Sequence, residues 1–288
     1  MDKTLLNVET QDSLQIALDA VHYWLLNSAA FRESLAMLVV DYQVAEKSKS
    51  QLINYLIKSK QDLLSKLEAF LKNKSLPIIR IQASLGAKYG KESDIYGAFD
   101  PSENCYIYIN SAMVKQAAIT PEPGLQISFL IFSKIIHELS HWITHFTMKN
   151  EEFLLTPSGF YGGEAGEFIE IEMFGDVVHH HSKSDVCPWE VELVIKAEST
   201  GSKSADYFQA EFMKLFFDKN VADSCTDFAT LQATSYTSSI YDRRLATVTK
   251  VSTHDEFGNK KQDGRTKNIS LEDVGGQYFI GRCIGHNF

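Results

Sequence analysis

The chain has 288 residues, of which 44% are hydrophobic and 23% are charged, and its formal net charge is -9. This composition is typical of an ordinary globular protein with enough chain to bury a sizeable core. An acidic chain without a long basic run gains little from phosphate backbones, so we expect no nucleic-acid partner. The sequence lacks a signal-like N-terminus and an apolar run of the ~18–20 residues needed to span a bilayer. We therefore expect a cytoplasmic protein with no membrane partner.

Residues 1–76 are expected to form a helical N-terminal subdomain. Apolar side chains recur at helical spacing over 14–25, 35–39 and 52–70, and Pro77 ends the pattern. The remaining residues, 77–288, are expected to form a second domain. We expect a sheet and one long helix in 77–148, and mostly helices in 149–288.

After Pro77 the pattern changes to short segments rich in β-branched and aromatic residues, which are typical of strands. These segments are 77–84, 95–99 and 104–110. A helix is predicted to start at Ser111, and "TPEPG" breaks the chain before the long helix. The predicted fold class is therefore α+β, with a small mixed sheet packed on the helix that follows.

The long helix is predicted over 125–146, which has no Pro or Gly and is apolar on almost every side, as a buried helix is. It carries His137, Glu138 and His141. Positions i and i+4 face the same side of a helix, so both imidazoles can reach one ion with Glu138 beside it. Because an unpaired buried polar group costs about 1–3 kcal/mol, these side chains need partners. The spacing predicts a zinc site with a glutamate base, and the alternative is two histidines hydrogen-bonded within the core.

A catalytic zinc ion takes three protein ligands, so a third must come from elsewhere. A half-buried helix over 164–175 carries four glutamates. Glu164, at its start, is the preferred third ligand, and Glu170 or Glu167 is the alternative. On a helix, Glu167 lies about 60° and Glu170 about 120° around the axis from Glu164, so Glu167 could also orient a ligand.

His137, Glu138 and His141, followed by the Glu164 helix, resemble the gluzincin branch of the zincin metallopeptidases. The resemblance covers roughly residues 100–180. It implies a zincin-like catalytic domain over 77–288, a Zn²⁺ cofactor, a peptide or protein substrate, and Glu138 as the general base. "CYIYIN" (105–110) resembles the edge strand that lines a zincin cleft.

The spacing of Glu164, Gly166, Glu170 and Phe174-Gly175 also resembles that of uncharacterised fungal proteins with the same two-histidine motif. The glutamate-then-aspartate spacing of better-known gluzincins is absent. Two further functions therefore stay open: another zinc chemistry, such as peptide natural-product tailoring or epoxide opening, or an inactive zincin that serves as a binding module.

Other residues carry weaker signals. Three adjacent histidines, 179–181, cannot all face one ion from a regular helix, so we expect no second metal there. Gluzincins often hold the oxyanion with a Tyr or His, for which Tyr236, Tyr241 and this histidine run are candidates. Arg243 or Arg244 could bind a substrate carboxylate. Beyond Trp189 mostly helix is expected, most clearly over 207–217.

Overall fold

The computed structural model describes residues 13–40, 49–83, 85–88, 95–103, 105–119, 124–147, 164–182, 189, 191–196, 204–233 and 238–241. None of the helices in these ranges is long and apolar enough to cross a membrane. The elements outside the centre of the fold are α2 (Ala29–Ala36), η1 (Met37–Val39), α4 (Lys49–Asn73), α5 (Leu85–Lys88), η2 (Pro101–Glu103), α6 (Ser111–Ile119), α9 (Ala210–Leu215), α10 (Lys219–Ser224) and α11 (Phe228–Ala233).

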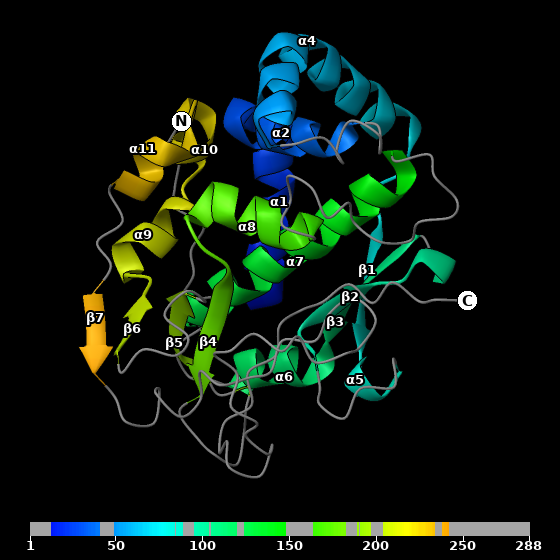
Figure 1. The fold of residues 1–288 in the computed structure, drawn as a ribbon. Helices are drawn as coiled ribbons and strands as arrows, with labels where there is room; N and C mark the ends of the chain where they lie inside the picture. Colours follow the sequence, from blue (N-terminus) through cyan, green and yellow to red (C-terminus); the bar gives the residue numbers. More distant parts are fainter. Residues whose placement is uncertain are drawn as a thin grey trace, which may run out of the picture.

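The centre of the fold is α7 (Leu125–Thr147), which is buried from Ile127 to Thr144. A helix that is apolar all round needs neighbours on every side. Here α1 (Ser13–Asn27), α8 (Ala165–Phe174) and both sheets pack against it (Figure 1). The prediction of a long buried helix is confirmed.

A three-stranded mixed sheet contacts α7, as predicted. Its strands are β1 (Ile78–Gln82), β2 (Gly97–Phe99) and β3 (Tyr106–Asn110), in the order β1-β3-β2. β1 and β3 are parallel, and β2 and β3 are antiparallel. The expectation that "CYIYIN" forms an edge strand is wrong: β3 is the central strand, β1 and β2 are the edges, and both β2 and β3 contact α7. β3 is almost fully buried because α5, α6 and α7 pack against it.

A second sheet was not predicted. β4 (Val178–Ser182), β5 (Val191–Lys196), β6 (Ser204–Tyr207) and β7 (Ser238–Tyr241) form an antiparallel sheet in that order. The expectation of a mostly helical C-terminal part is therefore wrong for these segments. The helix predicted over 207–217 is also shorter. It begins at Ala210, because Tyr207 pairs with β5 and β7 and the Phe208 N–H donates to the Val194 carbonyl.

The helices of the N-terminal part share one hydrophobic core with α7, α8 and the segment 210–228. Trp24 of α1 shows this connection, because its Nε1–H donates to the Phe216 carbonyl at 2.8 Å and its ring packs on Phe216 and Phe228. The mixture of helices and small sheets confirms the α+β class. The division of the chain at residue 76 stays a prediction.

Candidate metal centre

His137 and His141 lie on successive turns of α7, and their ring centroids are 5.1 Å apart. Both are buried, with exposed fractions of 0% and 5%. The Nε2 atoms of the two rings face the same carboxylate, so the i, i+4 spacing gives the common direction expected from the sequence.

That carboxylate belongs to Glu164, which caps the start of α8 with an extended backbone (φ -147°, ψ 123°). Its Oε1 lies 3.0 Å from His137 Nε2 and 3.2 Å from His141 Nε2. One ligand atom from each of these three residues lies within 4.8 Å of the other two. Two imidazole nitrogens and one carboxylate oxygen are the donor set of a catalytic zinc site with an open position.

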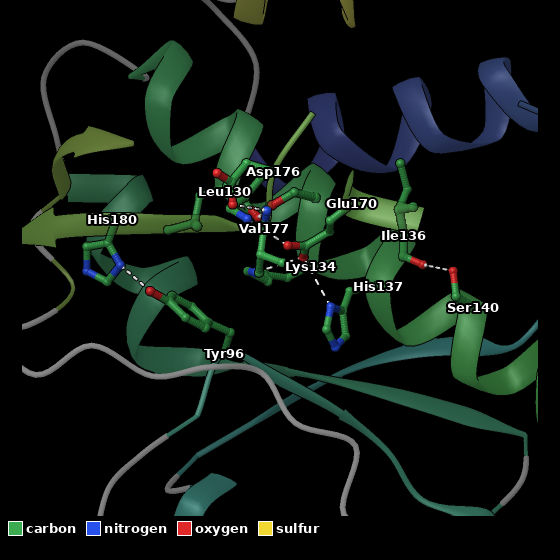
Figure 2. Close-up of polar contacts among 12 residues, drawn as sticks. Tyr96, Leu130, Lys134, Ile136, His137, Ser140, Glu170, Asp176, Val177 and His180 are labelled. Atoms are coloured by element: carbon green, nitrogen blue, oxygen red, sulfur yellow. Dashed lines mark hydrogen bonds and ion pairs between the residues drawn. The ribbon is translucent and has the colours of Figure 1, made fainter. Parts of the chain in front are cut away.

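Glu170 lies at the opposite edge of the His137 ring. Its Oε1 is 3.1 Å from His137 Nδ1 and 2.7 Å from Lys134 Nζ, and its Oε2 accepts the Val178 N–H at 2.7 Å (Figure 2). Burial by itself would raise the pKa of Glu170, but Lys134 and His137 outweigh it and hold that pKa below its usual value. Glu170 therefore occupies the place of a carboxylate that orients a metal-binding histidine. Glu167 is half-buried and is not part of the converging group.

Gly166 covers one face of the His137 ring. A Cβ at this position would lie 2.4 Å from Cγ, Cδ2 and Nε2 of the imidazole, closer than real Cβ contacts ever come. The backbone of α8 can approach the ring only because residue 166 has no side chain.

Glu138 is fully buried beside these ligands. Its Oε2 accepts the Phe99 N–H of β2 at 2.7 Å, whereas its Oε1 has no hydrogen-bond partner within the described part of the chain. Burial raises the pKa of Glu138 in spite of the two nearby histidines. One anchored oxygen and one open oxygen suit a group that exchanges protons with a water or a substrate.

The charges of the group also fit a divalent cation. Burial would lower the pKa of His137, but Glu164 and Glu170 at its two nitrogens raise that pKa to about 10. Without a metal, both nitrogens of His137 thus carry a proton. Nδ1–H donates to Glu170, and Nε2–H donates to Glu164. Lys134 balances Glu170 at 2.7 Å, which leaves two acidic groups, the buried Glu138 and Glu164, whose side chain is 13% exposed. If a divalent ion bound here, His137, His141 and Glu164 would hold it, and its charge would balance both acidic groups.

In a comparison with protein-family models, residues 30–175, just over half of the chain, match the model of Metallopeptidase toxin 3. The chain belongs to the metallopeptidase toxin 3 family. The matched segment includes both histidines, Glu138, Glu164 and the whole of α8. Comparisons with curated proteins and with solved structures give no match. A metallopeptidase family implies a hydrolase of peptide bonds that depends on a metal ion.

In this member of the metallopeptidase toxin 3 family, the histidine run lies on β4 rather than on a helix. His180 Nδ1 is 2.5 Å from Tyr96 OH, and the pKa of the buried His179 is lowered to about 3 by burial and by the charge of Lys134. The imidazole rings of His179 and His180 thus have different neighbours. Tyr236, Arg243, Arg244 and the side chain of Tyr241 lie outside the described residues.

Two residues of the site were not predicted to act there. Lys134 is the single lysine of the buried helix α7, one turn before His137, and such a buried cation signals a buried partner. Gly166 lies in the first turn of a helix, where glycine costs about 1 kcal/mol relative to alanine and so indicates a close contact.

Proposed function

We propose that this protein is a zinc-dependent peptidase in which His137, His141 and Glu164 hold the zinc ion and Glu138 is the general base. The observation that carries the proposal is the position of Glu164 Oε1 between two buried Nε2 atoms, next to a buried glutamate with one open oxygen. When bound, zinc supplies a Lewis acid that polarises the peptide carbonyl and lowers the pKa of water toward ~7.

Glu138 performs the proton transfers. Its Oε1 accepts a proton from the attacking water, while its Oε2 stays on the Phe99 N–H of the β2 edge strand. Glu138 then passes this proton to the leaving nitrogen, so that the amide bond breaks to give a carboxylic acid and an amine. A pKa raised by burial helps Glu138 hold the proton between these two steps.

Glu170 prepares His137 for this role. A proton on Nδ1 donated to Glu170 leaves Nε2 with a free lone pair that points at Glu164. This fixes the tautomer that binds a metal and increases the basicity of the ring.

A peptide or protein is the proposed substrate, because the family is one of metallopeptidases. Nucleic acid and membrane are not proposed as partners, since the net charge of -9 favours neither phosphate backbones nor anionic lipid. An inactive binding module would have no use for a buried base with an open oxygen, so the geometry of Glu138 favours an enzyme.

The test combines metal analysis with cleavage of a peptide library. We expect one zinc ion per wild-type chain and measurable cleavage. The Glu138→Gln variant should keep the zinc and the fold, because an amide oxygen can still accept the Phe99 N–H, but it should lose turnover by at least ~10²-fold. Glu172→Gln is the matched control, since Glu172 is on the exposed face of α8. Turnover by Glu138→Gln at the wild-type rate would refute the assignment of the base, and a metal-free active enzyme would refute the proposal as a whole.

A further inference from the structure

Lys134 is a buried cation that the proposed reaction does not use. Its side chain is 1% exposed, and it lies on α7 one turn before His137. Removing a charge from water is costly unless the charge is paired and hydrogen-bonded, so Lys134 must have a partner that repays this cost. That partner is Glu170, whose Oε1 lies 2.7 Å from Lys134 Nζ.

The same oxygen of Glu170 contacts a proposed metal ligand. Oε1 lies 3.1 Å from His137 Nδ1, so Lys134 and His137 share one acceptor atom (Figure 2). The other oxygen, Oε2, accepts the Val178 N–H from the start of β4 at 2.7 Å. The carboxylate is therefore fixed at both oxygens and cannot rotate away from the imidazole.

The fixed carboxylate sets the orientation of the His137 ring. With Nδ1 on Glu170, Nε2 faces Glu164 and His141, where the proposed ion binds. If Lys134 were absent, Glu170 would lose the closer of its two side-chain partners and keep only His137, so it would gain by turning toward any water or donor nearby. The ring would then lose the contact that fixes its direction.

Lys134 also joins this group to the strand that holds the base. Its Nζ lies 5.2 Å from the centroid of the Tyr96 ring, within the range of a cation–π contact. Tyr96 immediately precedes β2, whose Phe99 N–H binds Glu138. Lys134 therefore contacts Glu170, which supports the proposed ligand His137. It also contacts Tyr96, which leads into the strand that binds Glu138.

We propose that Lys134 is a positioning residue for the metal centre, which holds Glu170 in the orientation that presents His137 Nε2 to the ion. This inference rests on the proposed function, because it requires that His137 bind a metal. It predicts that Lys134 affects zinc affinity and the geometry of the metal site as well as the stability of the fold.

The test uses the full chain and two readouts that a purely structural lysine would not change. The first is the zinc dissociation constant from competition with a chromophoric chelator, and the second is the visible spectrum of the Co²⁺-loaded protein. We expect Lys134→Met to weaken zinc binding about 10–100-fold and to alter the Co²⁺ bands, as loss of a ligand's hydrogen-bonded support does. Lys134→Arg keeps a buried cation near Glu170 and should restore most of the affinity.

Phe174→Leu is the control for stability. Phe174 is buried at the far end of α8 among the rings of Phe129, Phe132 and Phe216, so its truncation should lower the melting temperature without changing zinc affinity. A Lys134→Met protein that is less stable but has wild-type zinc affinity and an unchanged Co²⁺ spectrum would overturn the inference, while the proposed function would stand.

Two outcomes separate the two proposals further. If Lys134→Met does not fold, Lys134→Met combined with Glu170→Gln removes both charges, and this double variant is expected to fold and to bind zinc about 10–100-fold more weakly than wild type. Wild-type affinity in that double variant would overturn the inference. A wild-type protein that binds no zinc would overturn both the proposed function and the inference that rests on it.

Discussion

Gly166→Ala is the substitution for which the structure gives the clearest expected magnitude. A Cβ at residue 166 would lie 2.4 Å from three atoms of the His137 ring, whereas ordinary contacts begin at 3.4 Å. Relief of this overlap requires the ring and the start of α8 to separate by about 1 Å, because a packed core accepts an added methyl group only by moving. Metal–ligand distances tolerate only about ±0.2 Å. We therefore expect zinc binding to weaken at least ~10-fold.

The effect of Gly166→Ala on stability has two parts of opposite sign. Alanine is favoured over glycine in a helix by about 1 kcal/mol, whereas overpacking costs about 1–3 kcal/mol. Urea unfolding should thus show that the metal-free variant is at most ~2 kcal/mol less stable than the metal-free wild type. With zinc present, the difference in the free energy of unfolding should be larger, because the variant binds zinc more weakly. Gly175→Ala is the control: its φ of +80° is strained for alanine, but the nearest atoms belong to Gln232 and not to the site. A Gly166→Ala protein that is about 1 kcal/mol more stable and has wild-type zinc affinity would refute the close contact.

Three further outcomes follow from the charges and contacts of the site. First, the metal-free protein should lose stability as the pH rises from the ordinary His137 pKa of 6.5 toward the raised pKa of about 10, and zinc affinity should rise over the same range because zinc displaces a proton. Calorimetry in buffers of different ionisation enthalpy counts that proton, and a pH-independent affinity would contradict the expectation. Second, Glu138→Gln should stabilise the metal-free protein at neutral pH, because burial raises the pKa of Glu138 and the ionised form opposes folding. Denaturation at several pH values should show this gain shrink as the pH falls below the raised pKa and vanish near the ordinary glutamate pKa of 4.5. Third, Gly97→Ala would place a Cβ 3.0 Å from the Tyr108 carbonyl and 3.2 Å from Glu138 Cγ, so kcat should fall more than zinc affinity; a selective loss of zinc would argue against this reasoning.

The sequence was sufficient to predict the central helix, the two histidines on one of its sides, and the first sheet. These features depend on local periodicity, which a single chain reveals. Local periodicity does not show which glutamate is the third member of the group with His137 and His141. Glu164 has an extended backbone outside α8, so its side-chain direction does not follow the helical rotation that relates Glu167 to Glu170. Glu170 does reach His137, but at the other nitrogen of the ring, which no helical wheel distinguishes.

The second sheet was missed for a different reason. β4 consists largely of histidines and pairs with β5, which in turn pairs with β6. Strand propensity measures how well a side chain fits a particular neighbouring strand, and the composition of one segment does not reveal that neighbour. Tyr207 illustrates this, because a helical pattern begins there although the residue is paired in β6. Tertiary pairing decides the structure at such positions.

The start of α8 shows how the candidate metal site conflicts with local helix preferences. The cap residue of a helix is usually Ser, Thr, Asp or Asn, whose side chain bonds to the first turn. Glu164 makes no such bond, and its carboxylate faces His137 and His141 instead. Gly166, in the first turn, is a poor helix former, yet only glycine fits against the ring. Both residues weaken the helix locally and both contact His137, so the segment is better explained by the needs of a metal centre than by those of a helix. Violations of local preference that converge on one side chain are the pattern expected of a functional site.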